Sequence, residues 1–246
     1  MSDILIPVER SVIWAADVST ERYMRIAPKL AQIGLGGVKL GFDVALGMSL
    51  SAAVDEIKNN ESEMVVIYDH QKAANDIPDT GKAFARRMKK SEVDAAILFP
   101  FTGLDAQKAW TSELQAAGVG VIIGSEMTHP GIYDHIKSGS FEKIFELAIE
   151  QEVTNFVVPG NKIDRVRYWR RFFDDRLGAG NFDLFSPGLI TQGGDVSETG
   201  LAAGRRFHGI VGRGIHGEDE KYRTPLQAKE AAKLIVEQLA GTAIEP

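Results

Sequence analysis

The sequence predicts an α/β fold, a single-domain (β/α)8 TIM barrel over residues 1–246. Three observations support this prediction. The chain has the length of one such barrel, short apolar runs alternate with amphipathic stretches, and eight of these runs can be counted. No long linker or sequence repeat divides the chain. Eight units favour a closed sheet, and a doubly wound open sheet is the alternative.

The expected strands are short β-rich segments that are apolar nearly throughout. Parallel strands that are buried on both faces have this pattern, whereas half-exposed strands alternate apolar and polar residues. The segments span residues 12–17, 37–41, 64–69, 94–99, 119–124, 155–159, 184–187 and 209–212.

The expected helices have apolar residues three and four positions apart. They span residues 20–32, 50–58, 80–90, 106–117, 141–150, 162–173 and 226–239. The last has the clearest start, because Thr224 can cap the helix while Pro225 occupies its first position. A helix after Asp195 is weakly predicted, since Gly200 and Gly204 disfavour it.

Composition limits the classes of function. The 34 acidic and 28 basic residues give a net charge of −6 with no basic field, so we expect no nucleic-acid partner. The absence of cysteine excludes disulfides, thiolate metal sites and a cysteine nucleophile. No apolar run reaches the roughly 18 residues of a membrane span. We therefore expect a cytoplasmic protein with no membrane partner.

Charged residues follow three of the expected strands. Asp17 and Asp69 end the first and third strands, Lys39 lies within the second, and Lys72 and Asp76 come after the third. A lysine in an apolar strand must be paired or reach out of the barrel mouth. Such an array can shift proton affinities and orient a lysine as a proton donor. The alternatives are an ordinary ion-pair network and, for Asp17, a helix cap.

Two glycine-rich loops follow the seventh and eighth strands. The first spans residues 186–195 and contains Gln192, and the second is Gly212-Arg213-Gly214. Loops in these positions are the usual phosphate site of this fold, and Gln192, Arg213 and backbone N–H groups can bind a phosphate. Residues 212–217 match the GxGxxG pattern, but no further βα unit follows. The five histidines show no metal-binding spacing, so no metal is expected.

The motifs together resemble the orotidine 5'-monophosphate decarboxylase family, in its archaeal-like compact form, over nearly the full length. The marks are AADV, VKLG, the Asp/Lys/Asp run that ends in DIPDT, SEMTHPG, SPGLITQGGD and IVGRGI. The resemblance implies decarboxylation of orotidine 5'-monophosphate (OMP) to uridine 5'-monophosphate (UMP), a step of pyrimidine biosynthesis, without a cofactor.

The resemblance also implies roles for the charged residues. Lys39, Asp69, Lys72 and Asp76 would form a catalytic tetrad, in which Lys72 protonates C6 of the pyrimidine. Asp69 would lie against the substrate carboxylate. Asp76 and Thr80 would reach into the neighbouring subunit's site, which implies a homodimer with shared active sites.

The remaining implied roles concern substrate binding. Asp17 would contact the ribose and Thr128 the pyrimidine edge. The loop from Pro187 to Gln192 would close over the ligand. The phosphate would be held by Gln192, Gly212 and Arg213.

Two departures from the family pattern matter. The usual Asp-x-Lys-x-x-Asp has one extra residue in each gap here, between Asp69 and Lys72 and between Lys72 and Asp76. Because residues i and i+3 of a regular strand face opposite sides, Lys72 can join Asp69 only through a bulge or turn. Thr128 stands where the family often has serine. A Mg²⁺-dependent sugar-phosphate lyase or aldolase of the same suprafamily, or a non-catalytic nucleotide-binding barrel, are the alternatives.

Overall fold

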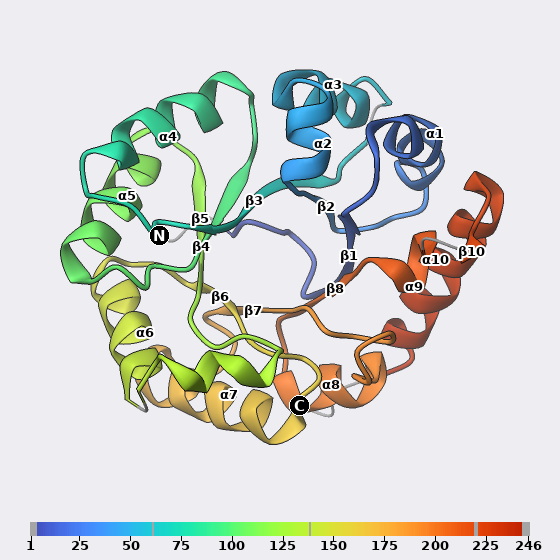
Figure 1. Ribbon diagram of the computed structural model, residues 1–246. Coiled ribbons are helices and arrows are strands. Elements are labelled where there is room, and N and C mark those ends of the chain that lie inside the picture. Colours follow the sequence, from blue (N-terminus) through green and yellow to red (C-terminus); the bar gives the residue numbers. More distant parts are fainter. Residues whose placement is uncertain (1–3, 61, 138, 219–220, 243–246) are drawn as a thin grey trace.

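The computed structural model describes residues 4–60, 62–137, 139–218 and 221–242, with Gln71 and Lys72 described by their backbone alone. Eight parallel strands form a closed barrel in which neighbours in sequence are neighbours in space, and β1 pairs with β8. Figure 1 shows the strands at the centre and the helices around them. The predicted fold is therefore confirmed, and the open-sheet alternative is wrong.

All eight predicted strands are present, with shifted ends. They are β1 (Arg10–Ala16), β2 (Gly37–Leu40), β3 (Val65–Ala73), β4 (Ala95–Leu98), β5 (Gly120–Gly124), β6 (Asn155–Val157), β7 (Asp183–Ser186) and β8 (Phe207–Val211). The largest difference is in β3, which continues past Asp69 to Ala73 and so includes Lys72.

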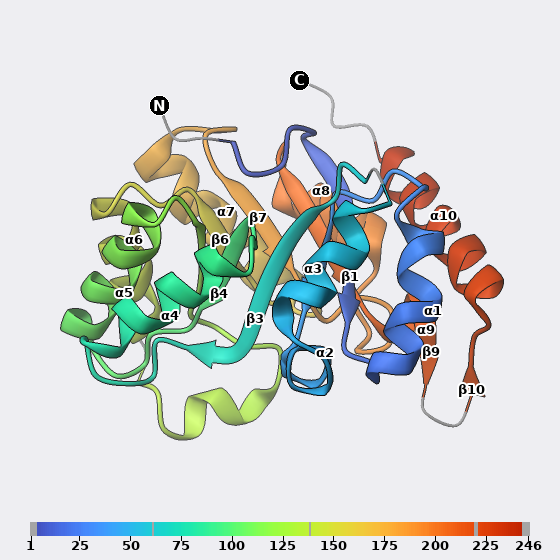
Figure 2. The same ribbon diagram turned by 90° about the horizontal axis from the view of Figure 1, so that it is seen from above.

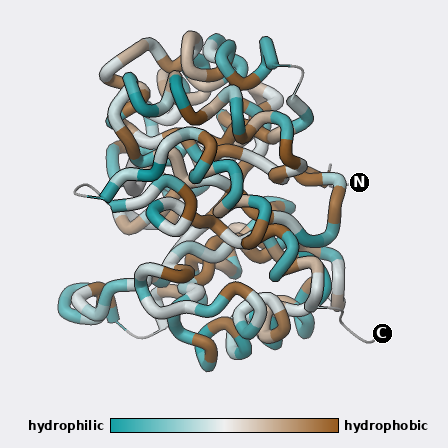
Figure 3. The backbone as a smooth tube through the Cα atoms, turned by 90° about the vertical axis from the view of Figure 1, so that its right-hand side faces the viewer, coloured by the Kyte–Doolittle hydropathy of each residue, from teal (hydrophilic) through white to brown (hydrophobic). Residues whose placement is uncertain are grey.

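The predicted helices are also present. They are α1 (Thr20–Leu30), α3 (Leu50–Lys58), α4 (Thr80–Lys90), α5 (Leu104–Ala116), α6 (Ser140–Glu150), α7 (Ile163–Leu177), α8 (Val196–Ala203) and α10 (Pro225–Ala240). Thr224 caps α10 in a capping box with Gln227, as its sequence indicates. Figure 3 shows apolar and polar stretches alternating along the outer helices.

Several short elements were not predicted. They are α2 (Phe42–Gly47), α9 (Arg213–His216), the 3-10 helix η1 (Pro130–Asp134), and the antiparallel pair β9 (Gly217–Glu218) and β10 (Lys221–Tyr222). Each is too short to show a hydrophobic period in sequence. Within the described residues, no helix has the length and apolarity to cross a membrane.

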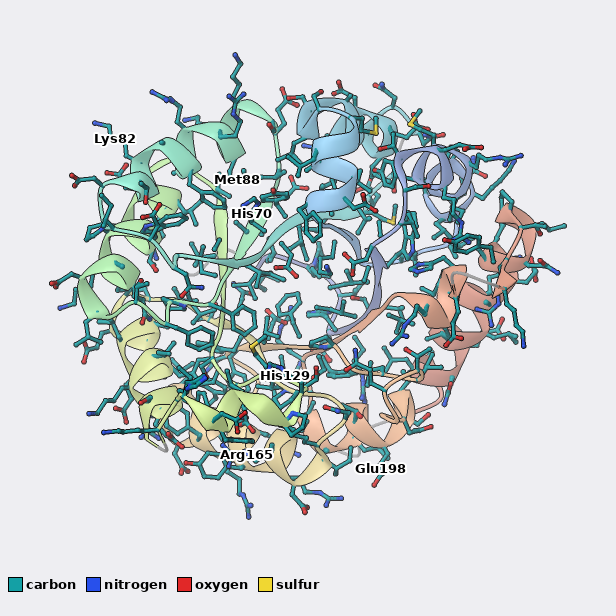
Figure 4. All side chains as sticks on the ribbon, viewed as in Figure 1. His70, Lys82, Met88, His129, Arg165 and Glu198 are labelled. Carbon is teal, nitrogen blue, oxygen red and sulfur yellow. The ribbon has the colours of Figure 1, made fainter. Side chains whose placement is uncertain are left out.

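The strands are buried on both faces. Along β1, Ile13 and Ala15 belong to an apolar cluster inside the barrel, whereas Trp14 and Ala16 belong to the layer between the sheet and the helices. Figure 4 shows side chains filling the centre of the barrel. This double burial explains why the strands are apolar nearly throughout.

A polar cluster lies inside the barrel near the starts of the strands. His208 Nε2 lies 2.9 Å from Asp183 Oδ1, and His208 Nδ1 lies 2.8 Å from Ser11 Oγ. Arg206 Nε donates to the same Asp183 oxygen at 2.7 Å and a second guanidinium nitrogen donates to the Ile6 carbonyl. Burial lowers the pKa of His208, although Asp183 opposes this effect.

Strand register places the site residues. Ala15 pairs with Lys39, and Lys39 pairs with Ile67, so these three residues form one level of the sheet. Asp17 and Asp69 each come two residues after members of that level, and therefore lie one step nearer the barrel mouth on the same face.

The expected irregularity in β3 is present. Asp69 and Ala73 of β3 pair with the consecutive residues Ile97 and Leu98 of β4, so the intervening residues bulge out of the ladder. Figure 2 shows β3 bending sharply near its C-terminal end. Ala74, directly after the bulge, is buried with φ +73°, and its carbonyl accepts a hydrogen bond from Thr102 at 2.9 Å.

Candidate active site

A cavity of about 360 Å³ opens at the C-terminal ends of the strands, where this fold carries its active sites. It brings together most of the residues that the sequence singled out. The predicted residues that line the cavity are Asp17, Lys39, Asp69, Thr128, Pro187, Gln192, Gly212 and Arg213.

Lys39 lies at one end of the cavity between two carboxylates. Its Nζ lies 3.1 and 3.2 Å from the two Asp17 oxygens and 3.2 Å from Asp69 Oδ2. The Lys39 and Asp69 side chains are buried, whereas that of Asp17 is half exposed. Burial alone lowers the pKa of Lys39, but the charges of Asp69 and Asp17 outweigh burial and raise it. Lys39 is therefore a fixed cation.

Asp17 does not cap α1, although its position in the sequence allowed that role. Ser19 caps α1 instead, accepting a hydrogen bond from the Arg22 backbone N–H at 3.5 Å. Asp17 thus turns its carboxylate toward Lys39. Gly41, which follows β2, approaches so closely that an added Cβ would lie 2.6 Å from Asp17 Oδ1.

Another part of the cavity lining is formed by the loop after β7 and the turn after β8. The loop folds on itself: the Ile190 N–H donates to the Gly194 carbonyl at 2.6 Å, and the Gly194 N–H donates to the Gly188 carbonyl at 3.2 Å. Gln192 and Arg213 are exposed in this part of the lining. An amide, a guanidinium and backbone N–H groups on the lining of one cavity suit an anionic ligand.

Part of the cavity wall is apolar. It is formed by Ile97 of β4, Phe99 directly after β4, Val157 of β6 and Ile210 of β8, all members of the apolar cluster inside the barrel. The lining of the cavity thus combines charged, apolar and anion-binding groups, as small-molecule sites commonly do.

Two predicted residues are not brought into this cavity. Asp76 and Thr80 are absent from its lining among the described residues. The exposed Asp76 side chain accepts from the Ile77 N–H at 2.7 Å, and Thr80, at the start of α4, donates to the Ile77 carbonyl at 2.7 Å. The side chain of Lys72 lies outside the part of the chain that the structure describes.

The cavity also contains residues that sequence reasoning missed. Glu126 and His216 are nearly fully buried and line it. His216 Nδ1 accepts a hydrogen bond from Trp14 Nε1 at 3.2 Å. Both lie within motifs already noted, SEMTHPG and the segment after IVGRGI, but no local pattern distinguishes a buried acid or histidine from an exposed loop residue.

The fold and cavity define a β/α barrel whose strand-end pocket suits an anionic small molecule. Residues 10–228 match the model of the "Orotidine 5'-phosphate decarboxylase / HUMPS family". The chain belongs to this family and is an enzyme, a carboxy-lyase.

Individual relatives agree with this assignment. The chain is 32% identical to the orotidine 5'-phosphate decarboxylase of Methanosarcina mazei, over 93% of the chain and 94% of the relative. It is 31% identical to that of Pyrococcus abyssi, over 94% and 99%. Among solved structures, orotidine 5'-monophosphate decarboxylase from Methanocaldococcus jannaschii complexed with the inhibitor BMP matches with TM-score 0.79 and 25% identity, covering 94% of this chain and 99% of that one.

Proposed function

We propose that the protein decarboxylates OMP to UMP in pyrimidine biosynthesis, with no cofactor. The observation that carries this proposal is that one cavity is lined both by the Lys39 ion pairs and by Gln192 and Arg213, which follow β7 and β8. A nucleoside monophosphate matches this lining, because its phosphate, ribose and base differ in charge and polarity.

The reaction breaks the bond between C6 and the carboxylate, leaves the electron pair on C6 and requires a proton there. We propose that Lys72 supplies this proton. Asp69 lies against the substrate carboxylate, and Lys39 helps to stabilise the developing negative charge at C6. The Lys39 ammonium group, 3.2 Å from Asp69 Oδ2, holds this carboxylate in place beside the reacting group.

The β3 bulge supports this role for Lys72 despite the lengthened Asp-Lys-Asp spacing. In an unbroken strand, Lys72 would face away from Asp69. A bulge changes which face the following residues take, and the register shift lies between Asp69 and Ala73, the segment that contains Lys72.

We propose that Asp17 binds the ribose, Thr128 the pyrimidine edge, and Gln192, Gly212 and Arg213 the phosphate. The loop from Pro187 to Gln192 then closes over the ligand. Binding energy from the phosphate, remote from C6, organises the site for the chemical step.

Asp76 and Thr80 complete the site of a partner subunit in a homodimer. Asp76 borders a surface cavity together with the exposed apolar residues Ile77 and Leu104, and Thr80 donates to the Ile77 carbonyl. Burial of these apolar side chains against a second copy would stabilise the dimer and carry Asp76 to the neighbouring site.

The test is the ultraviolet absorbance change when purified protein meets OMP in EDTA. Lys72→Ala should abolish turnover. Lys82→Ala is the matched control, because Lys82 on α4 points away from the barrel (Figure 4) and should keep full activity. Absence of turnover by folded wild-type protein in EDTA would overturn the proposal, and turnover of sugar phosphates with Mg²⁺ would indicate the lyase or aldolase alternative.

A further inference from the structure

Glu126 is a buried carboxylate that the proposed reaction does not use. It follows β5, and its side chain is 0% exposed. Its Oε2 accepts hydrogen bonds from Arg165 Nε at 2.8 Å and Trp169 Nε1 at 2.7 Å, both on α7. Figure 4 shows Arg165 on the side of the barrel that α7 covers. A charge buried so completely requires strong compensation.

The second oxygen of Glu126 is also bound. Oε1 accepts a hydrogen bond from the Tyr133 hydroxyl of η1, and Lys162 Nζ lies 3.9 Å away. Burial, together with the hydrogen bond to Glu126, raises the pKa of Tyr133 to about 12, so its hydroxyl remains a donor at neutral pH. The carboxylate thus joins β5, η1 and α7 at one point.

The residues directly after Glu126 are held from the same side. Lys162 Nζ donates to the Met127 carbonyl at 3.0 Å, and Asn161 Nδ2 donates to the Thr128 carbonyl at 3.4 Å. Lys162 therefore contacts both the Glu126 carboxylate and the backbone that carries Thr128. The position of residues 126–128 depends on this group of contacts.

Thr128 in turn contacts the loop after β7. A Cβ added at Gly188 would lie 2.8 Å from Thr128 Cγ2, 3.3 Å from Gln192 Oε1 and 3.4 Å from Asn161 Cβ. Gly188 thus packs against the methyl group of Thr128 and against the residue that holds the Thr128 carbonyl. A displacement of Thr128 would therefore change the position of the cavity wall and of the start of this loop.

We infer that Glu126 is a positioning residue, which holds Thr128 in place for recognition of the pyrimidine base through its contacts with Arg165, Trp169, Tyr133 and Lys162. This inference rests on the proposed function, since it concerns the base of a pyrimidine nucleotide. It predicts a larger effect on recognition of the base than on recognition of the phosphate, because Thr128 follows β5, whereas Gln192 and Arg213 follow β7 and β8.

The test compares two ligands by titration calorimetry: UMP, and ribose 5-phosphate, which lacks the base. The variants are Glu126→Gln, which removes the charge, and Trp169→Phe, a milder change that removes one donor and retains an aromatic ring. Each should weaken UMP binding about tenfold, the cost of one misplaced hydrogen bond, and leave ribose 5-phosphate binding within about twofold. KM for OMP should rise more than kcat falls.

Arg206→Met is the matched control. It breaks a buried arginine–carboxylate pair near the opposite end of the barrel, where Arg206 Nε lies 2.7 Å from Asp183. The control should lower the melting temperature without changing the ratio of the two affinities. Equal weakening of both ligands by Trp169→Phe, or unchanged UMP binding, would overturn the inference. Wild-type protein that neither binds UMP nor consumes OMP would instead overturn the proposed function.

Discussion

Lys39 and Asp69 form a buried ion pair with 3.2 Å between Nζ and Oδ2, although their Cα atoms are not partners in the sheet. Lys39 pairs with Ile67, two residues earlier on β3, so its side chain extends toward the barrel mouth to reach the carboxylate. Asp17 meets the same ammonium group from the other neighbouring strand. Residues of β2 and β3 and the residue directly after β1 therefore hold this ion pair together.

Breaking this pair from one side should be costly. Lys39→Met is expected to lower the free energy of unfolding by about 3 kcal/mol, because the Asp69 carboxylate then lacks this buried counter-charge. The double variant Lys39→Met/Asp69→Asn should recover about half of the loss. Urea unfolding measures both. Asp17→Asn, at the half-exposed partner, should cost less than about 1 kcal/mol, and a larger cost would contradict this account.

The close contact between Gly188 and Thr128 can be isolated with a second glycine of the same loop. Gly188 and Gly193 both have φ +89°, but only Gly188 has an atom within 4 Å of an added Cβ. Gly193→Ala should cost about 1 kcal/mol from its backbone conformation alone, while Gly188→Ala should cost about 2 kcal/mol or more and weaken UMP binding. Chemical unfolding and calorimetry measure the two effects, and identical results for both variants would refute the steric argument.

His208 should make the protein acid-sensitive. Burial lowers the pKa of His208 in the folded state. Below about pH 6.5 the unfolded chain therefore binds a proton at His208 that the folded chain does not bind. Stability should therefore fall as pH drops through this range, by at most about 1.4 kcal/mol per pH unit from this group. His208→Gln should flatten the profile of unfolding free energy between pH 7.5 and 5, whereas replacement of the exposed His135 should not. Parallel profiles for wild type and His208→Gln would contradict this.

Shared active sites can be tested by mixing inactive variants. Asp76→Ala and Arg213→Ala should each be inactive, since each removes a group from every site. If Asp76 serves the partner's site, an equimolar, re-equilibrated mixture should regain about a quarter of wild-type activity, because half of the dimers are mixed and each has one intact site. The decarboxylation assay on the mixture measures this recovery. No recovery despite exchange of subunits would mean that both residues serve the same chain's site.

Much of the fold could be predicted from the chain alone. Apolar runs and three- and four-residue spacings depend on interactions with near neighbours and solvent, so the eight strands and the long helices are readable locally. The same reasoning indicates that Lys39 needs a partner and that the Asp69–Lys72 spacing needs a bulge. The short elements α2, η1 and α9 were missed because they have too few residues to show a period.

The sequence by itself therefore determined the barrel, the end of it that carries the site, and the residues at the strand ends. Tertiary structure decided the partners. Lys39 binds Asp17 and Asp69 because strand register places both one step nearer the mouth, and Glu126 is bound by groups up to 43 residues away in sequence. Such pairings depend on distances set only when the sheet closes, and no local pattern contains them.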